Sequence, residues 1–188
     1  LTVTLNALIN SGDEIIIPLP FFPEYRVFAE NAGARVVTVQ CRKPDFQLDI
    51  KATENAVTEK TKAIIINSPN NPTGAVFSPD TIKALSDMLC KKQAEYGTDI
   101  YIIADEPYRE LSYGAEVPYI PKYYANTVIC YSYSKSLSLP GERIGYIFIP
   151  EGAADCRKLY AAVCGAGRAL GFVCAPSLMQ YTVAECTD

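Results

Sequence analysis

Short apolar runs alternate with longer segments of helical pattern along this chain of 188 residues. The apolar runs are rich in β-branched residues and are bounded by turn-forming residues, which is typical of strands buried on both faces of a sheet. The pattern predicts strands within EIIIP at 14–18, ARVVTVQ at 34–40, KAIIIN at 62–67, DIYIIA at 99–104, NTVICYSY at 126–133 and RIGYIFIP at 143–150.

The intervening segments predict helices over 1–10, up to about Asn31, over 48–57 and from Pro79 to about Tyr96. Ser78 is the expected N-cap of the long fourth helix, Pro79 stands at its first position, and Gly97 ends it. Residues 151–188 are expected to be mainly helical. Strands that alternate with helices indicate an α/β fold with a mostly parallel central sheet flanked by helices in three layers.

Composition removes several classes of function. The formal net charge is −4 and the pI is about 5.0, which does not favour a general nucleic-acid surface. The chain has no histidine, so Ser-His-Asp catalysis, Cys-His catalysis and histidine-based metal sites are excluded within it, and no metal site is expected. No apolar stretch reaches the roughly 18 residues that span a bilayer.

The seven cysteines are scattered and form no CxxC pair. We expect free, mostly buried thiols in a reducing compartment, and therefore a cytoplasmic protein.

Polar residues of unusual chemistry follow three of the expected strands. Asn71 comes after KAIIIN, Asp105 after YIIA, and Lys135 after VICYSY. Ligands of parallel α/β sheets bind at the carboxyl ends of the strands. An amide, a carboxylate and an amine are therefore expected in one site.

The chemistry of these groups points to one cofactor. A partly desolvated lysine near a cation is a nucleophile towards carbonyls, and Arg143 has the planar fork that suits a phosphate. Ser132 and Ser134 add hydroxyl donors to the same anion. A carboxylate pairs with a protonated ring nitrogen, Asn71 and Tyr108 donate to a ring oxygen, and Phe22 or Phe21 stacks on an aromatic face. Pyridoxal 5′-phosphate (PLP) has all of the complementary groups.

Three motifs carry a resemblance to a known family: NNPTG at 70–74, DEPY at 105–108 and SYSKSLSLPGERIGY at 132–146. In this order and spacing the chain resembles the class I/II aminotransferases, which are fold-type I PLP enzymes. The resemblance implies Lys135 as the Schiff-base lysine and acid/base, and Asp105 as the partner of the pyridine nitrogen. It implies Tyr108 and Asn71 at the ring oxygen, Arg143 with Ser132 and Ser134 at the phosphate, and Phe22 stacked on the ring.

The resemblance covers nearly all of the chain and extends to its organisation. Residues 1–188 resemble the large PLP-binding domain without the N-terminal arm, the start of the phosphate loop and the C-terminal small domain. The family implies a homodimer that exchanges an amino group between an amino acid and a 2-oxo acid. Aspartate or a broad aromatic or neutral amino acid is the expected donor, and this fragment alone is expected to be inactive.

Other interpretations remain open at this point. Lys135 could be a solvated loop residue, Asp105 a turn cap, Asn71 a turn former, and Arg143 an ion-pair partner of Glu142. The same cofactor site also serves carbon–sulfur lyases and other fold-type I reactions. A PLP-binding effector domain of an aminotransferase-like transcription regulator is an alternative of another class, and a degenerate domain without cofactor is a third.

Overall fold

The computed structural model describes residues 1–186 and contains a six-stranded sheet. The strand order is β2-β1-β3-β4-β5-β6. Pairs from β2 to β5 are parallel, and β6 runs antiparallel to β5. The strands are β1 (Glu14–Leu19), β2 (Arg35–Gln40), β3 (Thr61–Asn67), β4 (Tyr101–Asp105), β5 (Thr127–Ser132) and β6 (Gly145–Phe148). Each predicted run holds one strand, so the mostly parallel sheet is confirmed.

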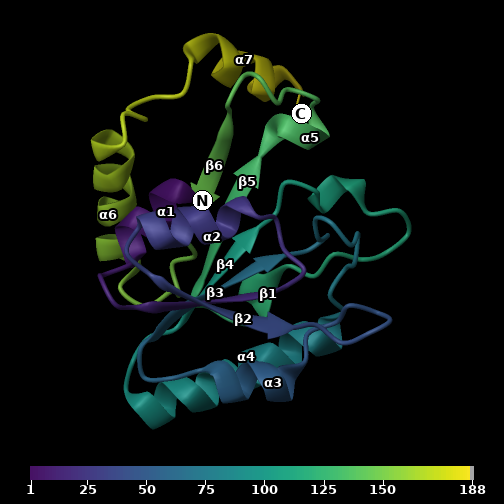
Figure 1. The fold of residues 1–188 in the computed structure, drawn as a ribbon. Helices are drawn as coiled ribbons and strands as arrows, with labels where there is room; N and C mark the ends of the chain where they lie inside the picture. The colour runs from purple at the N-terminus through teal and green to yellow at the C-terminus, as the bar shows by residue number, and fades with distance from the viewer. Residues whose placement is uncertain (187–188) are drawn as a thin grey trace.

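Helices cover both faces of the sheet (Figure 1). One face carries α3 (Ile50–Ala56) and α4 (Pro79–Tyr96); the other carries α1 (Thr2–Leu8), α2 (Glu24–Asn31) and α6 (Cys156–Ala169). Successive side chains of a strand point to opposite faces. Ile64 of β3 accordingly packs in one buried cluster with Leu85 of α4, and Ile65 in a second cluster with Leu5 of α1. The sheet therefore has a core on each side, as the three-layer prediction requires.

The ends of α4 follow the sequence signals. The Ser78 hydroxyl accepts a hydrogen bond from the Thr81 backbone N–H at 3.1 Å, which satisfies one of the free donors of the first turn. Gly97 ends the helix with φ of 66°, a left-handed conformation that glycine adopts without steric cost. The helix begins at Pro79, shortly after the NNPTG segment ends at Gly74.

Three local features differ from the prediction. Lys135 lies in a one-turn helix, α5 (Tyr133–Ser136), and not in a loop. The Ser132 hydroxyl caps this turn by accepting from the Ser134 N–H at 3.2 Å, which explains why a serine-rich segment becomes helical here. Two short 3₁₀ helices, η1 (Arg109–Leu111) and η2 (Ile120–Lys122), were not expected.

The C-terminal part is helical, as predicted. It consists of α6 and α7 (Ser177–Cys186), and the last two residues of the predicted helical region lie outside the described part. Within residues 1–186, no helix combines the length and the apolar character needed to cross a membrane.

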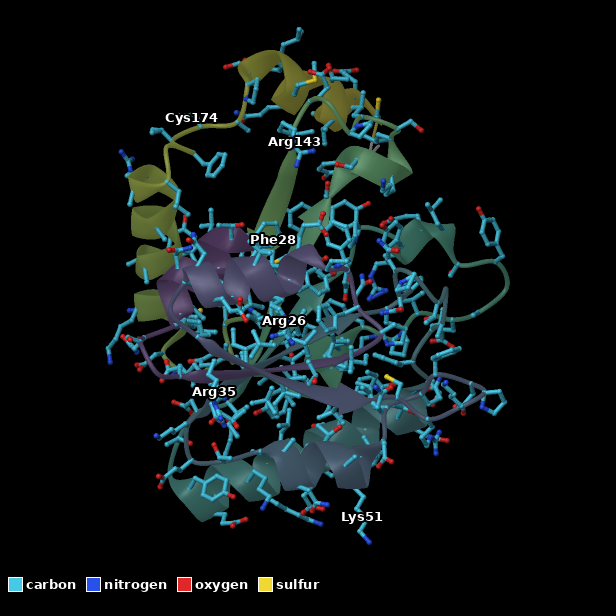
Figure 2. The ribbon with its side chains drawn as sticks, in the orientation of Figure 1. Arg26, Phe28, Arg35, Lys51, Arg143 and Cys174 are labelled. Carbon is cyan, nitrogen blue, oxygen red and sulfur yellow. The ribbon has the colours of Figure 1, made fainter. Side chains whose placement is uncertain are left out.

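The expectation that the cysteines are mostly buried is wrong. They are free thiols, but only Cys130 is buried. Four are exposed, among them Cys174, which lies between α6 and α7 (Figure 2). Four of the cysteines, Cys90, Cys156, Cys164 and Cys186, lie in helices, where the apolar strand pattern gives no information on burial.

Candidate active site

The carboxyl ends of the central strands lie side by side. Asn67 and Asp105, the last residues of β3 and β4, are direct partners in the parallel register, and Cys130 of β5 is the next partner of Asp105. Ser132 ends β5 two residues later. The polar residues that were selected from the sequence therefore come from one edge of the sheet.

Asp105 is held by a tyrosine of the neighbouring helix. The Tyr25 hydroxyl of α2 donates a short hydrogen bond to Asp105 Oδ2. Burial raises the pKa of Asp105 above its ordinary value, and the Tyr25 hydrogen bond acts in the opposite direction. Burial, together with the charge of Asp105, also raises the pKa of Tyr25 well above its usual range, so Tyr25 remains a donor. A cation placed against Asp105 would favour its ionised form, because its attraction would offset the cost of ionising a carboxyl group that is shielded from water.

Asn67 connects Asp105 to the NNPTG segment. Its Nδ2 donates to the Asp105 carbonyl at 2.9 Å, and its Oδ1 accepts from the Asn71 backbone N–H at 2.7 Å. Asn67 is only 4% exposed. The positions of Asn71 and Asp105 are thus linked through one buried amide.

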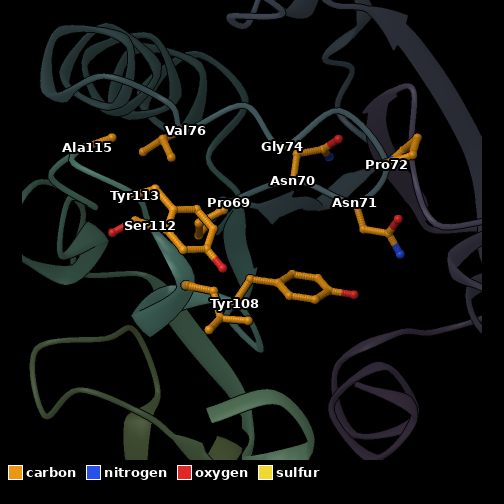
Figure 3. Close-up of a pocket in the computed structure, with 11 residues that line it drawn as sticks. Pro69, Asn70, Asn71, Pro72, Gly74, Val76, Tyr108, Ser112, Tyr113 and Ala115 are labelled. Atoms are coloured by element: carbon orange, nitrogen blue, oxygen red, sulfur yellow. The ribbon is translucent and has the colours of Figure 1, made fainter.

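Asn71 and Tyr108 line the same cavity, which has a volume of about 410 Å³. The Asn71 amide and the Tyr108 hydroxyl extend toward the same region (Figure 3). Lys135 Nζ lies 5.9 Å from the centre of the Tyr108 ring. The amide, the phenol and the amine are therefore neighbours, as the motifs predicted.

The α5 turn carries Lys135 together with the two serines. Ser132 Oγ and Ser134 Oγ are 2.7 Å apart and form a hydrogen bond. The turn is also fixed from the strand, since the Tyr131 hydroxyl donates to Ser136 Oγ at 2.8 Å. Tyr131 itself is buried and stacks on Tyr146 of β6. Lys135 is exposed, but its backbone belongs to a capped and anchored turn.

Arg143 is near α5 by its backbone, but its side chain does not reach the serines. The β5–β6 register pairs Ser132 with Gly145, and Tyr133 N donates to the Ile144 carbonyl at 3.1 Å. Figure 2 shows Arg143 near the start of β6. Its guanidinium donates to the Pro140 carbonyl at 2.6 Å, and within residues 1–186 it makes no hydrogen bond to Ser132 or Ser134.

Phe22 lies at the opposite end of the site. Its ring meets the Tyr25 ring edge-on, with 5.7 Å between the ring centres. Phe22 and Phe21 are both half-buried against the cluster on the α1 face of the sheet. A continuous set of contacts therefore runs from Phe22 through Tyr25 to Asp105, whereas the structure gives no preference for Phe22 over Phe21.

The chemistry of this donor set fits PLP. In the described chain, the ends of the Asn71 amide, the Tyr108 hydroxyl and the Lys135 ammonium have no hydrogen-bond or ion-pair partner. Asn71 and Tyr108 line one cavity, Lys135 lies beside the Tyr108 ring, and Asp105 is linked to Asn71 through Asn67. A ring with an oxygen, a carbonyl and a basic nitrogen complements all four groups. Within residues 1–186 no cluster of Cys, Asp or Glu side chains is suited to hold a metal ion.

Two residues of this arrangement were missed in the sequence. Asn67 ends an apolar strand, so the strand-end rule that selected Asp105 applies to it as well. Tyr25 has no such signal, because its contact with Asp105 joins residues 80 positions apart and depends on how α2 packs on the sheet.

Comparison with known proteins adds an independent result. The family model described as "Aminotransferase class I and II" matches residues 1–188. An amino transferase from Eubacterium rectale of known crystal structure is 57% identical, with a TM-score of 0.93 over 95% of this chain and 46% of that chain. The N-succinyldiaminopimelate aminotransferase of Mycobacterium tuberculosis is 30% identical, with a TM-score of 0.85 over 99% of this chain and 47% of that chain.

An aspartate aminotransferase from Musicola paradisiaca (strain Ech703) is 33% identical over 80% of this chain and 38% of its own length. The chain thus spans about half, or less, of the length of these relatives.

Proposed function

The chain belongs to the class I and II aminotransferase family, and from this premise we propose that it forms the large PLP-binding domain of a PLP-dependent aminotransferase. The observation that carries the proposal is the set of free polar ends, those of Asn71 and Tyr108 in one cavity and that of Lys135 beside the Tyr108 ring. The Asp105 residue is linked to this set through Asn67. When bound, PLP supplies an electron sink that stabilises negative charge at the α-carbon of an amino acid.

Lys135 is the proposed covalent anchor and proton carrier. Its amine is exposed beside the Tyr108 ring and has no acidic partner among the described residues, so it is free to react. With PLP and an amino acid bound, the same amine would be in place to take a proton from the substrate α-carbon and to return one to the carbon that derives from the cofactor aldehyde. Anchoring of α5 by Ser132 and Tyr131 keeps the amine in reach.

Asp105 is the proposed partner of the ring nitrogen. Its carboxylate, held by Tyr25, would keep a proton on that nitrogen through an ionic hydrogen bond. Asn71 and Tyr108 donate to the ring oxygen, and Phe22 covers one face of the ring. These contacts orient the ring and exclude water from one side of it.

Ser132, Ser134 and Arg143 are the proposed phosphate contacts. The two hydroxyls already lie within 2.7 Å of each other on α5, and the β5–β6 pairing brings the Arg143 backbone beside this turn. In this proposal, Arg143 exchanges its hydrogen bond with Pro140 for the phosphate. A guanidinium prefers the charged oxygen, because hydrogen bonds between two ionised groups are stronger.

The proposed substrates are an amino acid and a 2-oxo acid, and the active protein is proposed to be a homodimer. The Musicola relative is named an aspartate aminotransferase, which supports aspartate as a donor to test first. Aromatic and neutral donors remain in the same proposal, since none of the residues discussed above selects among side chains.

The test is amino-group transfer by the purified full-length protein with PLP. Each of a panel of amino acids is offered with a 2-oxo acid, and the new amino acid is measured by chromatography. The proposal predicts transfer from at least one donor and its loss in Lys135→Ala. Release of sulfide or ammonia without transfer would instead indicate a lyase, and PLP binding without turnover of any donor would indicate an effector domain.

A further inference from the structure

Asn67 lies between two proposed contacts of the cofactor ring but is not itself positioned to touch the ring. It is the last residue of β3 and is 4% exposed. Both ends of its side chain bind backbone groups: Oδ1 accepts the Asn71 N–H at 2.7 Å, and Nδ2 donates to the Asp105 carbonyl at 2.9 Å. Asn71 and Asp105 belong to different segments, and Asn67 is a residue that bonds to both.

We propose that Asn67 is a positioning residue that fixes the spacing between the Asn71 amide and the Asp105 carboxylate, so that ring oxygen and ring nitrogen are bound at once. The inference rests on the proposed PLP function. Asn67 would act through Asn71 and Asp105 and would not itself contact the cofactor ring.

The chemistry of the side chain supports this role. A primary amide presents one acceptor and one donor at a fixed separation, which a carboxylate, a hydroxyl or an aliphatic side chain does not. The segment from Asn70 to Gly74 is closed on itself, since Gly74 N donates to the Asn70 carbonyl at 2.8 Å and Thr73 binds Asn70 Oδ1. These internal bonds keep the turn in shape, whereas the Asn67 bond ties the turn to the end of β4.

Loss of Asn67 should therefore move Asn71 relative to the ring. With a weaker donor, the negative form of the ring oxygen is less stable, and the lysine-dependent absorbance should titrate at higher pH. For Asn67→Leu we expect a rise of about half a pH unit and PLP binding that is about three- to ten-fold weaker, the equivalent of one lost hydrogen bond.

Asn126 provides a matched control. It is also a buried asparagine, its Oδ1 accepts the Ala154 N–H at 2.7 Å, and its Nδ2 donates to Gln93 Oε1 at 2.9 Å. It immediately precedes β5, at the opposite end of that strand from Ser132. Asn126→Leu should lower the thermal midpoint of unfolding without changing the pH titration of the absorbance.

The experiment is a pH titration of the absorbance of the full-length protein with PLP, together with its PLP dissociation constant. It includes Asn67→Leu, Asn126→Leu, Asn71→Ala and the double variant Asn67→Leu/Asn71→Ala, with Asn67→Ser in reserve if the leucine does not fold. If Asn67 acts through Asn71, the midpoint of the double variant equals that of Asn71→Ala.

Additive shifts in the double variant, or a midpoint for Asn67→Leu and Asn67→Ser equal to that of Asn126→Leu, would overturn the positioning role. A wild-type protein that shows no lysine-dependent absorbance would instead overturn the proposed function, so the two failures are distinct.

Discussion

The Tyr25 hydroxyl donates to the Asp105 carboxylate across 80 positions of sequence. The contact joins α2 to the end of β4 and occupies one carboxylate oxygen, which leaves the other for a ligand. Burial raises the pKa of Asp105, and the hydrogen bond from Tyr25 opposes this by stabilising the ionised carboxylate. Tyr25 is therefore expected to control both the orientation and the charge of Asp105.

Tyr25→Phe should weaken PLP binding by roughly ten- to a hundred-fold near neutral pH, which corresponds to one hydrogen bond to a charged group. Without the donor, the pKa of Asp105 rises further, so the carboxyl is protonated at a higher pH. The loss of affinity should therefore increase as the pH falls. The measurement is the PLP dissociation constant as a function of pH.

Tyr101→Phe is the control for that experiment. Tyr101 lies at the start of β4, at the other end of the strand from Asp105, and its hydroxyl donates to the Ala154 carbonyl at 2.9 Å. This variant should leave the pH dependence unchanged. Equal pH dependence in the two variants would show that Tyr25 does not act on Asp105.

Asp105→Asn should stabilise the PLP-free protein while it abolishes tight binding of PLP. The folded pKa of Asp105 is raised, so the wild-type protein loses stability as the pH rises from the unfolded pKa through the folded one. Asparagine does not titrate and still accepts from Tyr25. At pH 7 to 8 we expect a gain of about 1 kcal/mol, or about 2–4 °C in Tm, that disappears toward acidic pH. Differential scanning calorimetry without PLP measures it, and a gain that is independent of pH would contradict the explanation.

Arg109→Ala should destabilise the protein by about 3 kcal/mol, because it leaves the buried Glu106 without its partner. Arg109 Nε donates to Glu106 Oε2 at 2.7 Å, and its other nitrogens donate to the Val117 and Pro118 carbonyls at 3.0 Å. Burial raises the pKa of Glu106 and Arg109 lowers it. In the variant the pKa rises further, so the deficit should grow as the pH increases from about 4.

Urea unfolding at several pH values tests the effect of Arg109. The control is Arg26→Ala, which removes an exposed i,i+4 pair with Glu30 and should cost no more than about 0.5 kcal/mol. A similar loss of unfolding free energy in both variants would show that the buried Arg109–Glu106 pair contributes no more to stability than an exposed pair.

Gly145→Ala should disturb the proposed phosphate site. A Cβ at Gly145 would overlap the Tyr131 carbonyl oxygen of β5, which is backbone and has no room to move without changing the strand pairing. Because this pairing brings Arg143 beside Ser132, the variant should bind inorganic phosphate and PLP more weakly. Gly141→Ala is the matched control, since its Cβ would meet nothing within 4 Å. Isothermal titration with PLP compares the two, and equal affinities would contradict this role of the β5–β6 pair.

The sequence was sufficient for the features that depend on local pattern. Apolar runs located the strands, and Ser78 with Gly97 located the ends of α4. The strand-end rule selected Asn71, Asp105 and Lys135, which the fold brings to one edge of the sheet.

The features that the sequence did not predict depend on tertiary packing. Tyr25 reaches Asp105 only because α2 lies on the sheet, and Tyr131 stacks on Tyr146 only because β6 pairs with β5. The Arg143 guanidinium donates to the Pro140 carbonyl and not to the serines of α5, and residue spacing does not determine which of these acceptors it binds. Burial of cysteines outside strands likewise depends on which helix face meets the sheet.

Trapping of the lysine bond tests the central claim most directly. The full-length protein is incubated with PLP and reduced with borohydride, and its peptides are analysed by mass spectrometry. The account predicts one pyridoxyl-labelled residue, Lys135, and no label in Lys135→Ala, while Lys83→Ala, which removes the exposed partner of Asp87, labels as the wild type does. Labelling at other lysines without Lys135, or unchanged labelling in Lys135→Ala, would contradict it.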